Sequence, residues 1–446
     1  MPGPADARDD HALEALRALI RIPTVSLREG SDPASFDALL TELEQRFPRL
    51  HAELDLTRIG THGLLFHWRG ESADRPVVLM AHLDVVPVDA DSPWQHDAFG
   101  GEIHDGAVWG RGTLDDKGCV AAICSAVERH LEAGTTPAQD VWLSFGNDEE
   151  VFGTAAEQAV AELEQRGVTP WFVIDEGGAV AHQAFPGVSA PVAVIGVAEK
   201  GSCSLELSAE GRGGHASMPA AKGPTYRIAR AITRLEKAPF PATLNAPTTA
   251  LLERMAPHAS RALRPVLANA GRFPKVTVRA LIAGGPESAA MTRTTLVATT
   301  LSASPAVNVI ASRATAGLNI RIAPGESVDS VVDHVRRAIA DKQVAIRVLE
   351  GGDPSPVSVF DDEAFALLED TVGEIFPDAV ASPYVLMAAT DSRHFARICE
   401  RVFRFAPFRM SKAQRQAIHS YDEHLGVDDY LDGVRWYHRL IERLPR

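Results

Sequence analysis

Short apolar runs alternate with stretches of helical periodicity through the N-terminal part of the chain. The spacing of leucines predicts a first helix over 11–22, which ends before Pro23. Three compact apolar runs follow at 76–80, 141–145 and 171–174, with helical patterns at 119–130 and 154–166 between them. Short continuous apolar runs alternating with helices are typical of a buried, largely parallel α/β sheet.

Polar side chains come directly after each of these three runs. They are His82 and Asp84, then Asp148, Glu149 and Glu150, then Asp175 and Glu176. In open α/β sheets, ligands bind outside the carboxyl ends of the strands. We therefore expect these three clusters to meet in space.

The pattern changes after about residue 200. Segments 202–208 and 315–322 alternate apolar and polar residues, as half-buried strands do. Helical patterns at 226–237 and 327–340 and an apolar run at 344–349 complete this region. Strands of this kind with two helices predict a second, α+β domain inserted into the first, compatible with a split βαβ arrangement. The Pro- and Ala-rich stretch 238–300 gives no assignment, and helices around an apolar run in 356–446 return to the first domain.

Composition and charge narrow the class of protein. The 446 residues are 45% hydrophobic and 23% charged, which is typical of a globular protein with two or three domains. The net charge of −15 repels phosphate backbones and anionic lipid, so nucleic acid and membrane are not expected partners.

The number of cysteines and the N-terminal sequence indicate in which cellular compartment the protein is expected. Four cysteines in so long a chain, with no CxxC pair, do not form a disulfide framework and fit a reducing cytoplasm. The N-terminus carries acids where a signal peptide needs basic residues, and no apolar run approaches the ~18 residues of a membrane span. We expect a cytoplasmic protein.

His82 and Asp84 are the first candidates for a functional site. Residues two apart in an extended strand face the same way, so Asp84 can accept a hydrogen bond from the imidazole. A carboxylate behind a histidine fixes the tautomer of a metal ligand. Taken alone, the pair fits a structural His–Asp contact at least as well.

Acidic clusters strengthen the interpretation as a metal site. Asp115 and Asp116 precede a helix, where acids also serve as simple caps. Adjacent carboxylates at the end of a buried strand, as in 148–150 and 175–176, repel each other and favour a bound cation or a raised pKa. An acidic surface turn is the alternative. Several such clusters together with a histidine point to divalent cations held by nitrogen and oxygen ligands.

These motifs, in this order, resemble those of the M20 family of metallopeptidases, which includes glutamate carboxypeptidases, aminoacylases and succinyl-diaminopimelate desuccinylases. The three strongest matches are MAHLDVVP at 80–87, GRGTLDDKG at 110–118 and NDEE at 147–150. Further matches, most similar to the branch of carboxypeptidase S and the N-acyl-amino-acid hydrolase/synthases, are Trp94, 105–106, 174–178, 198–201 and 390–393. The similarity extends from about Leu16 to the C-terminus.

The resemblance implies a catalytic α/β domain with a mostly parallel central sheet flanked by helices, in two chain segments, 1–198 and 354–446. It also implies an inserted α+β lid and dimerisation domain at 199–353, and hence a homodimer.

The resemblance further implies two divalent metals, most commonly zinc, with cobalt or manganese also accepted by such ligands. By position, His82 and Glu176 bind one metal, Asp115 bridges both, and Glu150 and His419 bind the second. Asp175 is the alternative to Glu176, and His394 and His424 match the C-terminal histidine less well than His419 does. Asp84 is expected to orient His82, and Glu149 to act as the general base.

Other matched positions concern the substrate. His215, after two glycines, corresponds to a histidine that stabilises the oxyanion from the partner subunit, although it could equally be an exposed loop residue. Asn308 and Arg321 match positions that bind the substrate carboxylate, or are plain strand-end residues; Arg393 is a further candidate for the same pocket.

The sequence thus predicts a dinuclear metallohydrolase that cleaves the amide bond next to a free carboxylate, in a short peptide or an N-acyl amino acid. An aminoacylase, or a synthase that runs the same reaction backwards, is the alternative within the enzymes. An inactive metal-stabilised binding protein is the remote alternative, and Glu149 beside a full ligand set counts against it.

Overall fold

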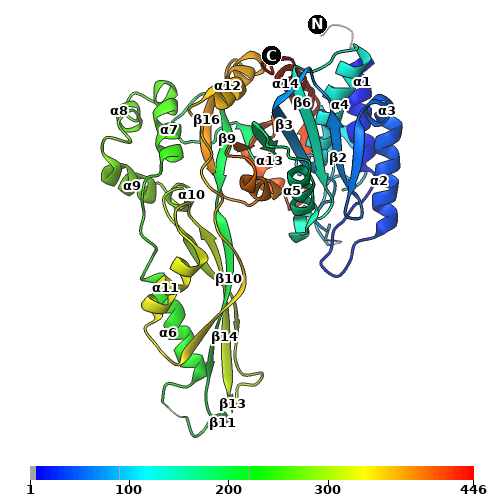
Figure 1. The fold of residues 1–446 in the computed structure, drawn as a ribbon. Helices are drawn as coiled ribbons and strands as arrows, with labels where there is room; N and C mark the ends of the chain where they lie inside the picture. The colour runs from blue at the N-terminus through cyan, green and yellow to red at the C-terminus, as the bar shows by residue number, and fades with distance from the viewer. Residues whose placement is uncertain (1–6, 90, 220) are drawn as a thin grey trace.

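A large sheet forms the centre of the larger of two lobes (Figure 1). The computed structural model describes residues 7–89, 91–219 and 221–446. From one edge of the sheet to the other, its strands are β1 (Asp55–Ile59), β2 (Gly63–Trp68), β6 (Gln139–Gly146), β3 (Ser72–His82), β7 (Phe172–Asp175), β17 (Val402–Arg404), β9 (Val192–Glu199), β8 (Ala179–Ala181) and β18 (Arg409–Met410), and β16 (Val380–Leu386) pairs with β9 outside this path. The central path β6-β3-β7-β17 is parallel, whereas β1, β2 and β6 pair antiparallel.

Helices cover both faces of this sheet. One face is covered by α1 (Ala7–Ile20), α4 (Lys117–Glu132) and α14 (Val427–Glu442), and the other by α5 (Ala155–Gln165) and η3 (Asp391–Arg397). Successive residues of β3 therefore point to opposite sides of the sheet. Val77 and Leu79 pack in the core under α1, α4 and α14, and Val78 and Met80 pack in the core under α5 and η3. A strand buried on both faces reads as a continuous apolar run, so the parallel sheet predicted from the sequence is confirmed.

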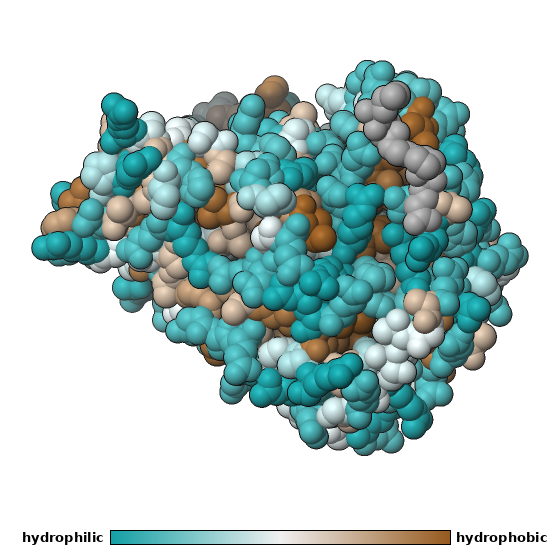
Figure 2. All heavy atoms as spheres, turned by 90° about the horizontal axis from the view of Figure 1, so that it is seen from above, coloured by the Kyte–Doolittle hydropathy of each residue, from teal (hydrophilic) through white to brown (hydrophobic). Residues whose placement is uncertain are grey.

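Smaller elements complete the large lobe. They are α2 (Pro33–Arg46), α3 (Pro48–Glu53), α12 (Glu363–Ile375), α13 (Lys412–Ala417), η1 (Glu149–Val151) and a three-stranded sheet of β4 (Glu102–His104), β5 (Ala107–Trp109) and β19 (His424–Gly426). Seen from above, this lobe shows mainly hydrophilic residues with scattered hydrophobic groups between them (Figure 2). No helix among the described residues is long and apolar enough to cross a membrane.

The second lobe, which we call the extended lobe, projects away from the first (Figure 1). Its four-stranded antiparallel sheet has the order β12 (Thr295–Ser302), β14 (Arg313–Ile322), β10 (Gly201–Glu210) and β15 (Val344–Gly352), with α6 (Pro224–Glu236) and α11 (Val328–Ile339) on one face. In chain order these elements read βαββαβ, the split βαβ pattern. The residues of β10 alternate between buried and half-buried, as the sequence predicts.

Two features of this region were not predicted. A two-stranded ribbon of β11 (Gly214–His215) and β13 (Val309–Ile310) lies at the far end of the extended lobe (Figure 1). The unassigned stretch 238–300 forms α7 (Ala246–Met255), η2 (Ala256–His258), α8 (Arg264–Leu267), α9 (Pro274–Ala283) and α10 (Pro286–Ala290) before it continues into β12. Leu251 and Met255 of α7 pack with Val192 of β9, so this segment adjoins the large sheet.

Candidate metal centre

The three polar clusters of the sequence meet at the carboxyl ends of neighbouring parallel strands. His82 is the last residue of β3, Glu149 and Glu150 lie on η1 after β6, and Glu176 follows β7. Because β6, β3 and β7 are adjacent and parallel, their carboxyl ends lie together, and these side chains meet there. The predicted convergence is confirmed.

Asp115 reaches these strand ends from the loop between β5 and α4. Gly110 and Gly112 in this loop have positive φ angles of 152° and 91°. A Cβ at Gly110 would lie 2.4 Å from Cγ2 of Ile20, so only glycine lets the loop pass so close to α1.

Glu423 anchors the same loop from the C-terminal part of the chain. Its carboxylate is fully buried and accepts hydrogen bonds from the backbone N–H groups of Gly112, Leu114 and Asp115. Arg111 donates to Glu423 at 2.6 Å and to the carbonyl of Ser420 at 2.5 Å. These contacts join the loop that carries Asp115 to the segment that carries His419.

The side chains form two groups that share Asp115. In one, ligand atoms of His82, Asp115 and Glu176 lie within 4.8 Å of one another, and in the other those of Asp115, Glu150 and His419 do. Oδ1 of Asp115 lies 2.9 Å from Nε2 of His82, and Oδ2 lies 3.0 Å from Nε2 of His419. The two oxygens of one carboxylate thus face two separate groups, as in a bridging ligand.

Asp84 holds His82 and the two glutamates together. Its side chain is fully buried and accepts hydrogen bonds from Ser26 Oγ at 2.6 Å and from the backbone N–H groups of Glu149 and Glu150. Nδ1 of His82 lies 3.3 Å from Oδ1 of Asp84 and 3.0 Å from the Asp84 carbonyl oxygen. This arrangement fixes the imidazole so that Nε2 faces Asp115.

Burial of several carboxyl groups together makes the centre electrostatically costly without cations. Burial raises the pKa of Glu150 and of Glu176, and the negative charge of Asp115 raises both further. Burial opposes protonation of His82, but its hydrogen bonds with Asp115 and Asp84 outweigh this and raise its pKa. Hydrogen bonds to Asp115 and Glu150 raise the pKa of His419 to about 10.

The residues present fit divalent metal ions. Oε1 of Glu150 is buried and has no hydrogen-bond partner, although buried polar atoms are nearly always paired. The two groups offer imidazole nitrogens and carboxylate oxygens, a donor set suited to zinc, cobalt or manganese.

Glu149 stands apart from both groups although it is the neighbour of Glu150. It is 9% exposed and belongs to neither set of ligand atoms. Burial raises the pKa of its carboxyl well above the usual value, with the charges of Asp391 and Asp115 acting in the same direction. Such a carboxyl is suited to take up a proton.

Asp175 and Glu176 are neighbours in the chain but have different partners. Oδ2 of Asp175 accepts a hydrogen bond from the backbone N–H of Ser392 at 2.9 Å, so this carboxylate holds the backbone of η3. Glu176 is the one within reach of His82 and Asp115. Of the alternative histidines, His394 lies on η3 and His424 stacks on Trp109 at 4.4 Å, and neither belongs to these groups.

The candidate substrate residues lie in three places. Arg393 is on η3, beside Asp391. Arg321 is near the end of β14 and pairs in register with Ser202, close to the large lobe. His215 and Asn308 lie together at the far ribbon, where the N–H of Ala216 donates to the carbonyl of Asn308. Within one chain the structure does not bring His215 and Asn308 to the metal centre (Figure 1).

Several residues that shape the centre had no role in the sequence prediction. Ser26 and Glu423 act through hydrogen bonds to Asp84 and to the Asp115 loop, and Oδ2 of Asp116 accepts from the N–H of His82. Their hydrogen-bond partners are distant in the chain, up to 312 residues for Arg111 and Glu423, so motif spacing gives no sign of these contacts.

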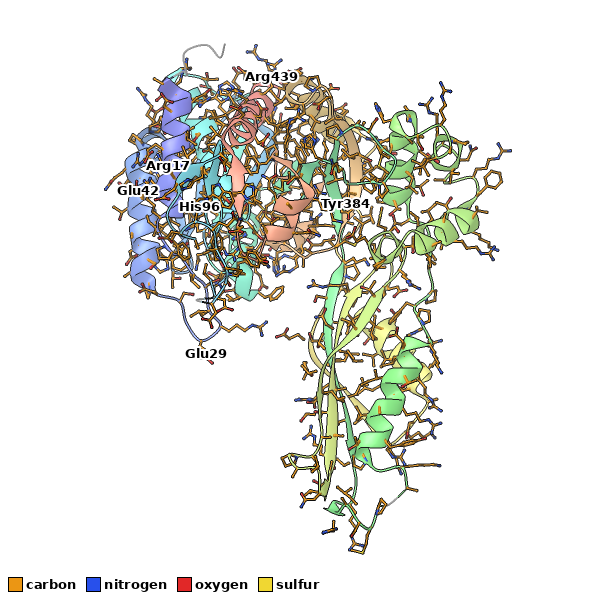
Figure 3. The ribbon with its side chains drawn as sticks, turned by 180° about the vertical axis from the view of Figure 1, so that it is seen from behind. Arg17, Glu29, Glu42, His96, Tyr384 and Arg439 are labelled. Carbon is orange, nitrogen blue, oxygen red and sulfur yellow. The ribbon has the colours of Figure 1, made fainter. Side chains whose placement is uncertain are left out.

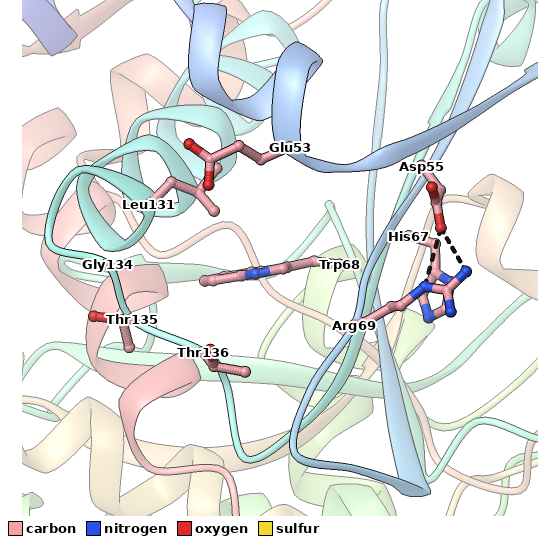
Figure 4. Close-up of a pocket in the computed structure, with 9 residues that line it drawn as sticks. All are labelled: Glu53, Asp55, His67, Trp68, Arg69, Leu131, Gly134, Thr135 and Thr136. Carbon is pink, nitrogen blue, oxygen red and sulfur yellow. Dashed lines mark hydrogen bonds and ion pairs between the residues drawn. The ribbon is translucent and has the colours of Figure 1, made fainter.

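A hollow elsewhere in the large lobe is unrelated to this centre. A cavity of about 300 Å³ is lined by Trp68, Arg69, Asp55 and Thr135, among others (Figure 4). Trp68 pairs with Val141 at the start of β6, whereas Glu149 follows the end of that strand. The hollow therefore lies at the opposite end of the strands from the metal centre.

Comparison with known proteins agrees with the motifs. The sequence matches Peptidase family M20/M25/M40 over residues 78–443. It is 35% identical over 409 residues to "Probable carboxypeptidase S-like 2" of Dictyostelium discoideum, covering 91% of this chain and 78% of that protein. It is 33% identical over 437 residues to the human "N-fatty-acyl-amino acid synthase/hydrolase PM20D1", covering 96% and 87%.

Solved structures share the fold. The M20 family metallo-carboxypeptidase Sso-CP2 of Sulfolobus solfataricus superposes with a TM-score of 0.73 at 17% identity, covering 97% of this chain and 98% of that one. Human carnosine dipeptidase 1 gives a TM-score of 0.68 at 16% identity, with 99% of both chains covered. A dinuclear metal-binding peptidase of Bacillus subtilis, YXEP, gives a TM-score of 0.62 at 13% identity, with 98% of both chains covered. The chain belongs to Peptidase family M20/M25/M40 and is a hydrolytic enzyme of that family.

Proposed function

We propose that this enzyme hydrolyses the amide bond next to a free carboxylate in N-acyl amino acids or short peptides, using two divalent metal ions per chain. The observation that carries the proposal is the pair of ligand groups that share Asp115, with Glu149 buried beside them but outside both. A metal pair needs a bridging ligand, and amide hydrolysis also needs a base that is not itself coordinated.

We assign His82 and Glu176 to one metal, Glu150 and His419 to the other, and Asp115 to both. Bound there, two divalent cations, zinc first among them, would lower the pKa of water and polarise the scissile carbonyl. Glu149 accepts the proton of the attacking water and passes it to the leaving amine. Asp84 holds the His82 ring and the backbone of both glutamates in place while the proton moves.

We assign recognition of the substrate carboxylate to Arg321, Arg393 and Asn308. A guanidinium offers two parallel N–H groups to a carboxylate, which suits Arg321 and Arg393 to this task. His215 stabilises the oxyanion, and because it lies at the far ribbon of its own chain, we propose that it acts in the site of a partner subunit. Asn308 lies beside His215 at the far ribbon, so we propose that it, too, acts in the site of a partner subunit.

A homodimer is supported by the edge of the extended lobe. β12 is an edge strand of its sheet, and Val297 and Leu301 on it are 56% and 66% exposed. An exposed apolar edge strand favours pairing with another chain. A cytoplasmic location is supported by the four cysteines, all of which are free and buried.

A metal count tests the proposed centre. Purified enzyme is expected to hold at least two metal ions per chain, to lose activity in chelator and to recover it with zinc or cobalt. His419→Ala should lower the count by about one ion, whereas His258→Ala on η2 should leave it unchanged. An active preparation with metal content near zero would refute the assignment.

A turnover screen tests the substrate class. N-acyl amino acids that differ in acyl length are compared with Gly-X dipeptides, each with a free and an amidated carboxyl terminus. We expect turnover of free acids only. Relatives named N-fatty-acyl-amino acid synthase/hydrolase favour long acyl chains and suggest assaying the reverse condensation in parallel. Equal turnover of amidated substrates would contradict the proposal.

A further inference from the structure

A second cluster of metal-ligating side chains lies in the large lobe, outside the centre described above. It consists of His96, Glu102 and His104, and one ligand atom of each lies within 4.8 Å of the others. Nε2 of His104 is 2.9 Å from Oε2 of Glu102, and the rings of His96 and His104 are stacked with centroids 3.7 Å apart. Figure 3 labels His96 in the large lobe.

The backbone that carries these three side chains is well fixed. Glu102 and His104 are two residues apart on β4, so their side chains face the same way. β4 pairs with β5, and the indole N–H of Trp109 donates to the carbonyl of His104. The rings of Trp109 and His96 meet in a T-shaped arrangement, with centroids 4.6 Å apart.

The loop that carries His96 is tied down at both ends of its turn. The backbone N–H and the side-chain amide of Gln95 both donate to Asp422 at 2.8 Å. On the other side, the N–H of Arg111 donates to the carbonyl of Ala98. The backbone on both sides of His96 is therefore held in place by contacts that do not depend on a metal.

We propose that His96, Glu102 and His104 form a further metal site, which binds one zinc ion with water in the open position. Two imidazole nitrogens and one carboxylate oxygen are a common zinc donor set. The lone pair of each ring nitrogen lies in the ring plane, so one imidazole must rotate out of the stack to share the ion. The side chains of His104 and Glu102 are 38% and 59% exposed, which leaves room for this rotation and for water.

The site adjoins the segment that holds the catalytic ligands. Asp422, the partner of Gln95, lies three residues after His419, and Arg111 lies over the ring of Trp94, 5.5 Å from its centroid. Bound zinc would cross-link β4 to the loop 94–99. It would thereby stabilise the same contacts that position His419 and Asp115, without itself meeting the substrate.

Zinc content at defined free zinc tests the site. Whole enzyme and the variants His96→Ala/His104→Ala and Glu102→Gln are dialysed against buffered zinc and their metal content is measured. The unaltered enzyme should retain about one more ion per chain than the double variant, whatever the catalytic centre holds. His258→Ala, which removes an exposed imidazole on η2, should match the unaltered enzyme.

Thermal unfolding supplies a second readout. An ion that binds only the folded state raises its stability in proportion to the logarithm of free zinc. Added zinc should therefore raise the Tm of the unaltered enzyme more steeply than that of Glu102→Gln, because this nearly isosteric variant has one fewer zinc site in the folded state. Equal zinc content and equal Tm shifts in all the variants would overturn the proposal and leave the cluster as a surface stack with an ion pair.

Discussion

Glu149 and Glu150 are neighbours in the chain, yet they lie in different surroundings. Glu150 is 3.1 Å from Nε2 of His419, whereas Glu149 belongs to neither group of candidate ligands. The difference arises because η1 turns the two side chains in different directions while Asp84 accepts a hydrogen bond from each backbone N–H. One carboxylate is thus available as a ligand and the next as a base.

Replacement of Glu149 by Gln is expected to lower kcat by about 10² to 10⁴ while both metals remain bound, because only proton transfer is lost. The measurement combines steady-state kinetics with elemental analysis. Glu157→Gln, an exposed glutamate on α5, is the matched control and should keep normal activity. Loss of metal from Glu149→Gln would mean that the residue is a ligand.

Arg321 and Arg313 lie on the same strand, β14, and differ in their partners. Arg313 pairs with Glu206, whereas Arg321 lies near the buried Lys200 at the end of the strand towards the large lobe. A cationic side chain near another cation is poorly placed for stability and well placed to meet an anion.

Arg321→Lys keeps the charge but loses the paired N–H groups of the guanidinium. We expect kcat/KM for free-acid substrates to fall about 10- to 100-fold, the cost of a lost charged hydrogen bond, with little change for amidated analogues. Arg313→Lys should change neither. Equal losses on both kinds of substrate would assign Arg321 a structural role.

At the scale of elements, the helices and strands that have a local hydrophobic pattern could be predicted from the sequence. The helices at 119–130 and 154–166 appear as α4 and α5, and the run at 76–80 lies within β3. These elements were recognisable because each buries a contiguous or periodic apolar surface.

The elements that were not predicted depend on contacts between distant residues. The stretch 238–300 forms short helices that begin at prolines and pack on β9 and β16, and no single amphipathic stripe marks them. The ribbon of β11 and β13 joins segments almost a hundred residues apart. In the metal centre, His82, Glu150 and Glu176 lie at or just after strand ends, whereas Glu423 acts through backbone groups that no motif spacing reveals.

The contact between the Asp115 loop and the His419 segment gives an element-scale prediction. The side chains of Arg111 and Glu423 are 3% and 0% exposed, so Glu423→Gln leaves a buried guanidinium without its carboxylate. Breaking such a pair costs about 3 to 5 kcal/mol. We expect denaturant unfolding to reveal a loss of this order, together with weaker metal binding.

Glu374→Gln provides the comparison, since it removes one carboxylate from exposed ion pairs with Arg439 and Arg443. Exposed ion pairs are screened by solvent and add little to stability, so this variant should unfold at nearly the normal denaturant concentration. If both variants lost the same stability, the Arg111–Glu423 pair would have no special part in joining the two segments.

At the scale of the whole molecule, the proposed catalytic groups are divided between the two lobes. The metal ligands and Glu149 lie in the large lobe, whereas the exposed His215 lies at the far end of the extended lobe (Figure 1). Ser217 donates to Nδ1 of His215 through its backbone N–H, which leaves Nε2 directed to other partners. A chain in this conformation needs either a second copy or a large lobe movement to complete the site.

The heterodimer of two inactive variants distinguishes these possibilities. Loss of an oxyanion donor costs about 10² to 10³ in kcat, so His215→Ala should be nearly inactive with its metals retained. If His215 acts in the partner's site, a dimer of one His215→Ala chain and one Glu149→Gln chain contains one site with both residues intact. Activity should then return on mixing, up to about half that of the unaltered enzyme in the mixed dimers. An absence of recovery despite subunit exchange measured by mass spectrometry, or full activity in a monomer, would show that His215 reaches only its own chain's site or none.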